Sequence, residues 1–366
     1  MWLVDEMGYI QSQNDTCVYY HPDTKHTVVV WVDDLICRGS QQVSDEFYSK
    51  LAQKFDCKEP QYVTEDNSIT FTGWDISMRA VAGDQVFSLS QQRELEMFLE
   101  EYELSEVQER QSPMPDKRKL VDSTVITENE QKWCRAVIGG LNHFVRPTRY
   151  DIAHAVSRVS ADMKEPTLGT VSAIRQIAGY LKGTTGLSLT GKKATGLDTY
   201  EVYVDSDHFG DRHRSSKSHS GLLVFLNGVL VAWRSKKQKS KNTALSPVES
   251  EIYALSEGTK EARNVAWVLQ EMGSRFEMPM EVMCDSDGAV KFAKDAYYDT
   301  KIKGVFDKRE EWVKELRGSD LNIKVIASKQ NWSDMMTKCL KAPEYKRQMK
   351  GIMEKSKVNF GRHLYE

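Results

Sequence analysis

The sequence has few cysteines, and none of them stands in a pattern that would bind a metal or form a disulfide framework. Its six cysteines are scattered over 366 residues, without a C-x-x-C pair. Zinc sites and small disulfide-stabilised domains both need cysteines at close, regular spacing. The pattern therefore argues against both kinds of site and predicts reduced thiols, which are typical of intracellular proteins.

Long apolar runs and a strong net charge are also lacking. No apolar stretch reaches the length that spans a bilayer, and the N-terminus has no basic-then-apolar signal. We therefore expect a soluble intracellular protein, cytoplasmic or alternatively nuclear, without a membrane partner. The formal net charge is −3, so the chain as a whole has no nucleic-acid-binding signature. A length of 366 residues predicts two or three domains.

Positive charge is nevertheless concentrated locally. One cluster falls within six residues and consists of Lys236, Lys237, Lys239 and Lys241. The segment 343–366 is predicted to be a basic C-terminal tail. Such clusters hold nucleic-acid phosphates through contacts that do not depend on base sequence. The alternative is a solvated lysine face, which is at least as common for any one cluster.

The stretch from Ser246 to Glu257 predicts the start of a long helix. Ser246 suits the N-cap, Pro247 the first helical position and Glu249 the third. Apolar and small residues then recur at helical spacing and predict one buried stripe: Val248, Ile252, Leu255, Thr259, Ala262, Ala266 and Leu269. At about 100° per residue, Glu251 lies roughly 55° from the centre of this stripe, and Glu249 about 105° away. Glu249 is therefore interpreted as a capping residue and Glu251 as a carboxylate directed towards the core.

The remaining segments predict a chain in which sheets and helices alternate. Apolar or alternating runs predict strands at 16–21, 26–37, 69–78, 85–89, 201–205, 221–226, 229–233, 281–285 and 322–327. The dipeptide Asn227-Gly228 predicts a hairpin turn. Three helical pieces between 128 and 182 are separated by Pro147 and Pro166. Strands that alternate with helices in the last third predict a mixed sheet with helices on its faces.

Four acidic residues of the last third stand at the ends of predicted elements. Two end strands, one lies on the first turns of the long helix, and one opens the last helix: Asp205, Asp285, Glu251 and Asp334. If the strands adjoin, these carboxylates converge on one rim of the sheet, where they cannot all stay ionised without protons or cations. Mg²⁺ prefers oxygen ligands, and two such ions about 4 Å apart can hydrolyse a phosphodiester. For Asp334 alone, a favourable contact with the helix dipole is a simpler explanation.

Several ordered motifs extend this pattern over most of the chain. They are Ala136-Val-Ile-Gly-Gly-Leu141, Asp151-Ile-Ala-His-Ala-Val-Ser157, Tyr180-Leu-Lys-Gly-Thr184, Tyr203-Val-Asp-Ser-Asp-His-Phe-Gly-Asp211, Ser235-Lys-Lys-Gln238, Ala244-Leu-Ser-Pro-Val-Glu-Ser-Glu-Ile-Tyr-Ala-Leu-Ser-Glu257, Cys284-Asp285 and Ser333-Asp-Met-Met-Thr-Lys-Cys-Leu340. With these motifs the chain, from Trp2 to about Leu340, resembles the C-terminal part of the Pol polyprotein of copia-type LTR retrotransposons. That part comprises the end of the reverse transcriptase, its connection and ribonuclease H.

The resemblance implies an α/β and α+β fold with four segments. These are a partial reverse-transcriptase palm and thumb at 1–112, a helical connection at 113–198, a ribonuclease H-like mixed sheet flanked by helices at 199–342, and the basic tail. It also implies that the metal-binding and catalytic carboxylates are Asp205, Glu251, Asp285 and Asp334. The implied activity is hydrolysis of the RNA strand of an RNA–DNA hybrid with two Mg²⁺ ions, Mn²⁺ being the alternative. Implied partners are that hybrid, held by the lysine cluster, and the rest of a Pol polyprotein or another reverse-transcriptase subunit.

The motif Trp31-Val-Asp-Asp34 resembles the family's aromatic-x-Asp-Asp hairpin, in which two aspartates hold the metals of nucleotide addition. Asp33 and Asp34 are therefore candidate metal ligands at the tip of a predicted hairpin, and the alternative is that they are ordinary turn residues. Nucleotide addition in the family also needs an aspartate on an earlier palm strand and fingers that hold the nucleotide. Neither precedes Asp33 in the sequence from Met1, so we expect no RNA-directed DNA polymerase activity from this chain alone.

Departures from the family keep two further functions open. No histidine lies between Asp285 and Asp334, where many ribonucleases H have one that helps product release, and Trp31 replaces the usual tyrosine. One alternative is a non-catalytic nucleic-acid-binding remnant of a decayed retroelement. The other is a fragment of a full RNA-directed DNA polymerase polyprotein. A turn-rich stretch also contains three histidines, which we expect to be surface loop residues rather than a metal or base site: His208, His213 and His219.

Overall fold

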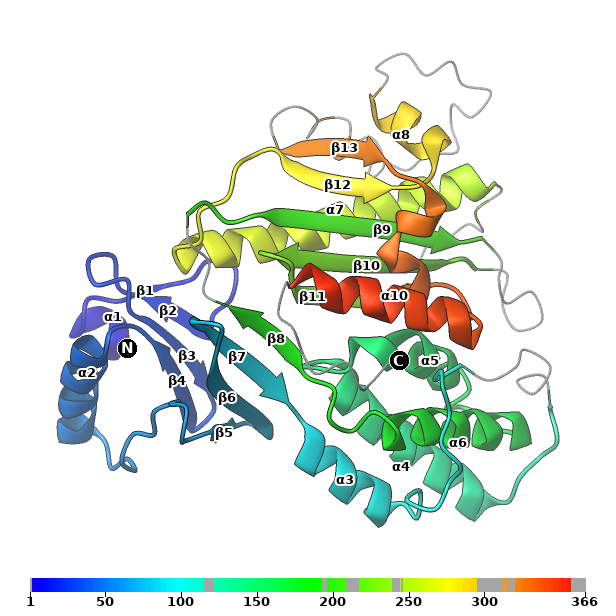
Figure 1. Cartoon of the computed structure of the whole chain (residues 1–366), viewed down its shortest axis with the longest axis horizontal. Coiled ribbons are helices and arrows are strands. Elements are labelled where there is room, and N and C mark those ends of the chain that lie inside the picture. The colour runs from blue at the N-terminus through cyan, green and yellow to red at the C-terminus, as the bar shows by residue number, and fades with distance from the viewer. Residues whose placement is uncertain are drawn as a thin grey trace.

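A mixed sheet of five strands is the central element of the C-terminal half (Figure 1). The computed structural model of the chain describes residues 2–114, 122–192, 196–208, 217–238, 244, 246–294, 312–313, 315 and 320–356. Within these residues the strand order is β11-β10-β9-β12-β13. β9 is antiparallel to β10 and parallel to β12, which is in turn parallel to β13, so the sheet combines an antiparallel meander with three parallel strands. The strands are β9 (Tyr200–Asp207), β10 (His219–Leu226), β11 (Val229–Lys237), β12 (Met280–Cys284) and β13 (Leu321–Val325).

The turn between β10 and β11 confirms the hairpin predicted at Asn227-Gly228. Both residues have positive φ angles, 54° and 76°. Asn and Gly tolerate this conformation best, and two such residues in succession match the twist of the flanking strands. The Asn227 side chain also accepts a hydrogen bond from the Thr199 N–H at 2.8 Å, which ties the hairpin to the start of β9.

Helix α7 (Pro247–Glu271) covers one face of this sheet, as its sequence predicted. The Ser246 hydroxyl accepts a hydrogen bond from the Glu249 N–H at 3.1 Å, which confirms the predicted N-cap. The core of the predicted stripe is buried against β9 and β10. Gly258 allows close approach, because a Cβ there would lie 2.6 Å from Cγ1 of Val204. A shorter helix, α8 (Asp287–Lys294), packs on the same face.

The opposite face of the sheet shares one core with the helices that precede it in the sequence. These are α4 (Glu128–Val145), α5 (Ala153–Ser160) and α6 (Leu168–Lys182), with the predicted breaks at Pro147 and Pro166 confirmed. The Trp233 indole N–H donates to the Val145 carbonyl at 2.8 Å, and the Tyr345 hydroxyl donates to the Asp151 carbonyl at 2.8 Å. The expected segments 113–198 and 199–342 are therefore joined by a continuous apolar interior rather than by a linker alone.

The expected basic tail is in part a packed helix. Residues 342–355 form α10 (Ala342–Lys355), which lies along the second face of the sheet (Figure 1). Its buried residues recur at helical spacing: Tyr345, Gln348, Met349 and Ile352. The lysines and arginines that suggested a tail occupy the other positions of an amphipathic helix, so charge alone was misleading. Residues 357–366 lie outside the described residues.

The N-terminal part contains two further antiparallel sheets. The first has the order β1-β2-β3-β4 and is followed by α2 (Gln41–Lys54); the second has the order β5-β6-β7-β8. The predicted strand 26–37 is split at Val32-Asp33, and 69–78 at Thr72-Gly73, so each forms a hairpin. The strands are β1 (Ile10–Gln11), β2 (Val18–Tyr20), β3 (Thr27–Trp31), β4 (Asp34–Arg38), β5 (Ile69–Phe71), β6 (Trp74–Val81), β7 (Asp84–Ser90) and β8 (Leu189–Lys192).

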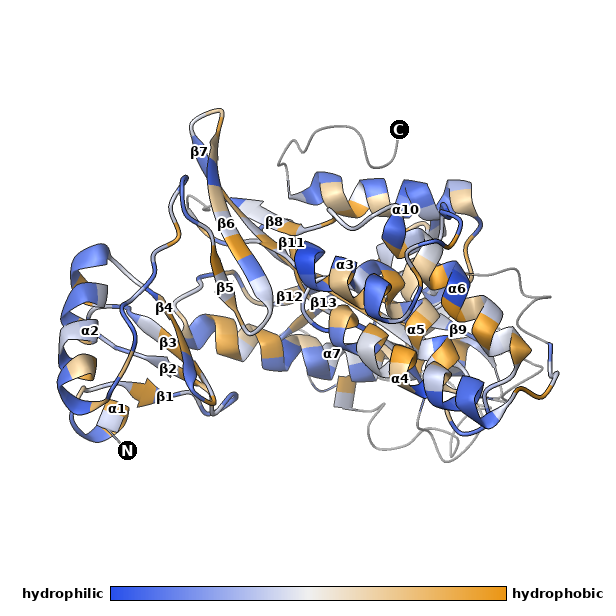
Figure 2. Cartoon of the chain, turned by 90° about the horizontal axis from the view of Figure 1, so that it is seen from below, coloured by the Kyte–Doolittle hydropathy of each residue, from blue (hydrophilic) through white to orange (hydrophobic). Residues whose placement is uncertain are grey.

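The two N-terminal sheets stand beside the helix-covered C-terminal part, and the β6–β7 hairpin projects away from it (Figure 2). The remaining helical segments are short: α1 (Trp2–Asp5), α3 (Gln92–Glu101), η2 (Tyr150–Ile152), η3 (Ser328–Gln330) and η4 (Trp332–Met336). Among the described residues, no helix combines the length and the apolar composition needed to cross a membrane. Together these elements form the α/β and α+β fold that the sequence predicted.

Candidate metal centre

Adjacent strands bring two of the predicted acids to the same edge of the central sheet. Asp205 lies near the end of β9, and Asp285 directly follows β12. The two strands are parallel, with Met283 opposite Tyr203, so two residues further on Asp285 comes beside Asp205. Parallel strands end at the same edge of a sheet, and both carboxylates are therefore presented at the carboxyl ends of β9 and β12.

The other two acids reach this edge from helical segments. Glu251 lies on the first turns of α7, and Asp334 in η4. Carboxylate oxygens of Asp205, Asp285 and Asp334 lie within 4.8 Å of one another. A second group, with ligand atoms equally close, joins Glu251 to Asp285 and to the thiol of Cys284. Asp285 is common to both groups, so the structure places the four predicted carboxylates around one point.

Asn331 fixes η4 against the sheet and was missed at the sequence level. Its side-chain amide donates to the Val204 carbonyl at 3.0 Å and to Oδ1 of Asp285 at 3.1 Å. Its Oδ1 accepts from the Ser333 hydroxyl at 2.6 Å. Asn331 is fully buried, and these bonds therefore connect β9, Asp285 and the turn that carries Asp334. An asparagine three residues before Asp334 could have predicted this role, since asparagine is a preferred cap of helical turns.

Thr337 and Lys338 contact the acids directly, and both were also missed. The Thr337 hydroxyl donates to Oδ2 of Asp205. Nζ of Lys338 lies 3.2 Å from Oδ1 of Asp205 and 2.5 Å from Oδ1 of Asp334. The Asp205 side chain is completely buried, so these contacts replace the hydration that it lacks. Lys338 follows Asp334 by four residues, a spacing that places side chains on the same face of a helical turn.

Burial and the charges of neighbouring acids favour the protonated forms of Glu251, Asp334 and Asp205. Burial raises the pKa of Glu251 to about 9, and the charges of Asp205 and Asp285 add to this effect. Burial and the charge of Asp205 raise the pKa of Asp334 to about 6. Burial also raises the pKa of Asp205, against the attraction of Lys338. Burial alone would lower the pKa of Lys338, but the charges of Asp205 and Asp334 outweigh it and raise that pKa above its usual range.

The donor set fits a hard divalent cation. The four predicted ligands offer only carboxylate oxygens, which Mg²⁺ and Mn²⁺ prefer. Oε2 of Glu251 is buried and has no hydrogen-bond partner among the described residues, so one oxygen of this ligand set is left unsatisfied. Burial raises the pKa of the Cys284 thiol, so this sulfur stays protonated and is a poor ligand. The residues present therefore fit an ion held by oxygen atoms.

Asp33 and Asp34 lie in a different environment. They are exposed at the tip of the β3–β4 hairpin, beside the exposed side chains of Trp31 and Val32. Within the described residues, neither belongs to any group of three metal-ligating side chains. The structure thus confirms the predicted hairpin tip, but no described acid joins Asp33 and Asp34 in such a group.

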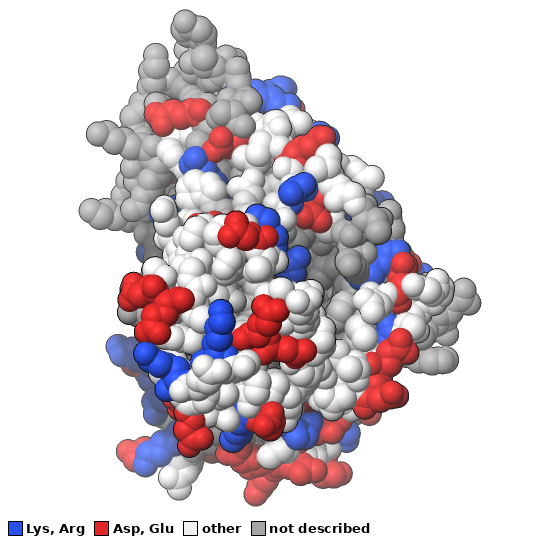
Figure 3. All heavy atoms as spheres, turned by 90° about the vertical axis from the view of Figure 1, so that its left-hand side faces the viewer, with Lys and Arg blue, Asp and Glu red and all other residues white. Residues whose placement is uncertain are grey.

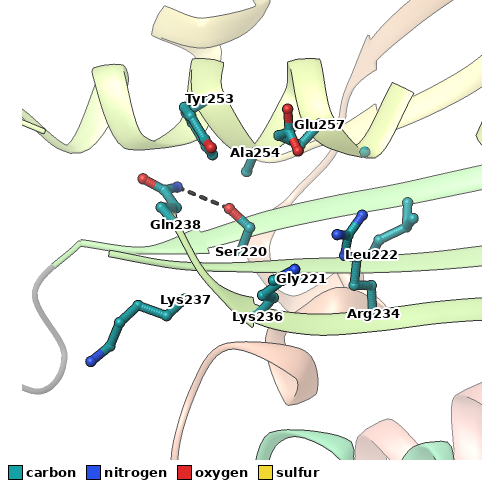
Figure 4. A pocket seen from close by; sticks show the side chains of 11 residues that line it. Ser220, Gly221, Leu222, Arg234, Lys236, Lys237, Gln238, Tyr253, Ala254 and Glu257 are labelled. Atoms are coloured by element: carbon teal, nitrogen blue, oxygen red, sulfur yellow. Dashed lines mark hydrogen bonds between the residues drawn. The ribbon is translucent and has the colours of Figure 1, made fainter. Parts of the chain in front are cut away.

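The lysine cluster is only partly described. Lys236 and Lys237 end β11, whereas Lys239 and Lys241 lie outside the described residues. Between α7, β10 and β11 there is a cavity of about 120 Å³, and Lys236 and Lys237 are among its lining residues. The end of the Lys237 side chain extends away from the cavity (Figure 4). None of the four clustered carboxylates lines this cavity. On the side of the molecule that carries the N-terminal sheet, Lys and Arg are interspersed with Asp and Glu over the described surface (Figure 3).

One histidine differs from expectation. His219 is not in a surface loop but in β10, where it is buried and hydrogen-bonded to the Ser235 hydroxyl at 2.8 Å. Its ring contacts that of His154 from α5, with ring centroids 4.8 Å apart. Burial lowers the pKa of His219 to about 3, so this ring is neutral and joins the sheet to the helices. His213 lies outside the described residues.

Comparison with known proteins places the chain beside transposon Pol polyproteins. The retrovirus-related Pol polyprotein from transposon TNT 1-94 of Nicotiana tabacum is 28% identical over 341 residues, which are 90% of this chain and 25% of that protein. The one from transposon RE1 of Arabidopsis thaliana is 26% identical over 339 residues, which are 91% of this chain and 22% of that protein. The chain thus spans a quarter or less of the length of these relatives.

Other comparisons cover less. The secreted RxLR effector protein 161 of Plasmopara viticola is 38% identical over 127 residues, which are 35% of this chain and 87% of that protein. A solved structure of a foamy viral protease-reverse transcriptase in complex with double-stranded DNA aligns with a TM-score of 0.46 at 12% identity. That alignment covers 82% of this chain and 46% of the viral chain. No protein-family model matches the chain.

Proposed function

Because this chain belongs to the copia-type Pol polyproteins of LTR retrotransposons, we propose that residues 199–342, together with α10, form a metal-dependent ribonuclease H. Its reaction is hydrolysis of the RNA strand of an RNA–DNA hybrid inside the cell, in the cytoplasm or the nucleus. The observation that carries the proposal is the convergence of four carboxylates at the edge of β9 and β12. These carboxylates belong to Asp205, Glu251, Asp285 and Asp334.

The four carboxylates would hold two divalent cations, Mg²⁺ or alternatively Mn²⁺. When bound, such ions activate the attacking water and stabilise the leaving oxygen of a phosphodiester. Asp285, which belongs to both groups of ligands, would help to hold a cation together with either group. Asn331 holds Asp285 in place, and the Thr337 hydroxyl holds Asp205. Glu251 would give up its proton as the cations enter, because metal ligands must be deprotonated.

Recognition of the substrate is assigned to the same edge of the molecule. Lys236 and Lys237 would hold backbone phosphates, a contact that is largely independent of sequence. We extend this role to Lys239 and Lys241 on their sequence alone. The 2′-hydroxyls in the minor groove of the hybrid would identify the RNA strand.

The N-terminal segments are proposed to be part of a reverse transcriptase, with palm and thumb at 1–112 and connection at 113–198. The rest of a Pol polyprotein, or another reverse-transcriptase subunit, is the proposed partner. We propose that this chain alone does not extend a primer, because the described residues place no third acid beside Asp33 and Asp34. Primer extension by the purified chain on a primed RNA template would contradict this.

Cleavage of a labelled hybrid tests the nuclease. The purified chain should shorten the RNA strand of a 5′-labelled RNA–DNA hybrid in Mg²⁺ and leave it intact in EDTA. Asp285→Asn should abolish cleavage, whereas Asp287→Asn should not. Asp287 is the matched control because it lies two residues away, is exposed and pairs with Lys291 at 2.5 Å. A wild-type protein that binds the hybrid without cutting it would favour the non-catalytic nucleic-acid-binding alternative.

A further inference from the structure

The positively charged ammonium group of a lysine lies within the proposed metal centre. Nζ of Lys338 lies between the carboxylates of Asp205 and Asp334, at 3.2 Å and 2.5 Å. Its side chain is about one-third exposed, whereas those of the two acids are 0% and 12% exposed. A lysine ammonium on a flexible stem can therefore leave towards solvent, while the acids that it joins are fixed in the interior.

The Lys338 ammonium forms hydrogen bonds with members of only one of the two groups of ligands among the described residues. Asp205, Asp285 and Asp334 form the group that Lys338 contacts. The other group contains Glu251 and Asp285, and Lys338 has no hydrogen bond to either among the described residues. Any effect of Lys338 on cations should therefore concern one position more than the other.

We propose that Lys338 is an internal competitor of the metal. In the metal-free protein its ammonium takes the place between Asp205 and Asp334 that one divalent cation would occupy, and it must withdraw before both cations are held. This proposal rests on the proposed metal centre. Charge balance supports it: four carboxylates carry −4, two divalent ions supply +4, and an ammonium kept in contact would leave an excess of +1. In the absence of metal the same ammonium offsets part of the repulsion among the acids.

Two consequences follow for the chain itself. Lys338 stabilises the metal-free fold, because its positive charge offsets the repulsion between the buried carboxylates. It also weakens cation binding at one position, because the ion must displace an ion pair before it can bind. The lysine thereby raises the concentration of divalent ion that is needed to occupy that position.

Direct measurement of Mn²⁺ binding tests the proposal without reference to catalysis. The full metal-free chain is titrated with Mn²⁺ by calorimetry and by electron paramagnetic resonance of the free ion. Removal of a unit charge at contact distance should change affinity about tenfold or more. Lys338→Met should therefore bind one Mn²⁺ ion about tenfold more tightly than the wild type. Unchanged or weaker binding, or no Mn²⁺ binding by any variant, would overturn the proposal.

Two variants control for charge and position. Lys338→Arg keeps the positive charge and should stay within about threefold of the wild-type affinity. Lys341→Met makes the same charge change three residues later on an exposed side chain, and it should also leave the affinity within that range. If Lys341→Met strengthened binding as much as Lys338→Met, a general charge effect would explain the result and the competitor role would be lost.

The wild-type protein supplies a second measurement if Lys338→Met does not fold. Acylation of lysines, followed by mass spectrometry, should label Lys338 several-fold faster in saturating Mn²⁺ than in EDTA, because the ion pair has been broken. Equal or slower labelling in Mn²⁺ would contradict displacement. The hybrid-cleavage assay separates this inference from the proposed function. Displacement of Lys338 without cleavage would refute the nuclease alone, and cleavage with unchanged labelling and affinity would refute the competitor alone.

Discussion

The chain contains two groups of acidic residues that the sequence marks as candidate metal ligands, and the fold places the two groups in different environments. Asp33 and Asp34 lie on a two-stranded tip, in water, with no third acid beside them among the described residues. In the other group, Asp205, Asp285 and Asp334 come from separate elements and lie together at a buried edge of the central sheet. Burial changes the chemistry, because it raises the pKa of a carboxylate and makes a cation or a proton necessary. Acidic residues thus become a candidate metal centre through convergence and desolvation rather than through their identity.

The largest expected effect is on the rate of hybrid cleavage, compared between one substitution in each group of acids. Asp205→Asn should lower the rate of hybrid cleavage at least about a hundredfold, since even residues that only support a metal ligand cost up to about that much. Asp33→Asn should leave the rate unchanged, because this side chain is exposed. It belongs to the β3–β4 hairpin, which lies on the other side of the molecule from the carboxyl ends of β9 and β12 (Figure 1). Initial rates on a labelled hybrid measure both. Equal losses for the two variants would remove the distinction between the groups.

A pH series tests whether burial controls the cluster. In the metal-free protein Glu251 keeps its proton up to a pKa of about 9, whereas the unfolded chain loses it near 4.5. Between these values the folded state binds more protons, so stability is highest at low pH and falls as the pH rises. Compared with Glu251→Gln, the wild type should lose about 1 kcal/mol of unfolding free energy per pH unit between pH 6 and 8.

Denaturant melts in EDTA at several pH values measure this difference. Glu249→Gln, a substitution on the same first turn, should show the wild-type slope. With saturating Mg²⁺ the decline should disappear, because cation binding replaces the proton. A wild type and a Glu251→Gln variant with parallel pH profiles would show that Glu251 is not held protonated by the fold.

A third comparison concerns the polar residues that support each group. Asn331→Ala removes hydrogen bonds to Val204 and Asp285 in the interior and should lower the unfolding free energy by about 1–3 kcal/mol. Asp33→Ala at the exposed tip should change it by less than about 0.5 kcal/mol. Chemical denaturation of both variants gives the values. A small loss for Asn331→Ala would mean that η4 is held mainly by its apolar contacts.

The smallest effect concerns the exposed tip alone. Val32 has a φ of 54°, a left-handed conformation that is unfavourable for a β-branched residue, and its side chain is 83% exposed. Val32→Asn should therefore raise the unfolding free energy by about 1 kcal/mol. Val125 is equally exposed but does not have a positive φ, and Val125→Asn should bring no gain. Equal effects of the two substitutions would argue against backbone strain at the tip.

Local patterns in the sequence predicted most elements of the fold. Ser246 and Pro247 begin α7, Asn227-Gly228 turns the hairpin, and the proline breaks separate the connection helices. Each of these depends on a few neighbouring residues, and such signals can be read without knowledge of distant contacts. The expected basic tail is in part a packed helix, because a count of lysines does not consider the helical spacing of Tyr345, Met349 and Ile352.

The candidate site was predictable only in part. Positions at element ends singled out the four acids, but their assignment as metal ligands stays a prediction. Asn331, Thr337 and Lys338 were missed, although they lie within a few residues of Asp334. Besides neighbours such as Asp334, their partners are Val204, Asp205 and Asp285, more than forty residues away in the sequence. Polar residues of these types are common in loops, and only the tertiary contacts distinguish them.

The sequence by itself therefore determined which residues cap the helices, form the hairpin turns and make up the apolar stripes. These conformational preferences act over one or two turns of the backbone. It also determined that four acids stand at the ends of elements. Only the tertiary structure decided that β9 and β12 are neighbours, that α10 closes the second face, and that an ammonium stands among the carboxylates. The physical reason is that burial, charge coupling and hydrogen bonding depend on distance in space, and contacts between distant segments set that distance.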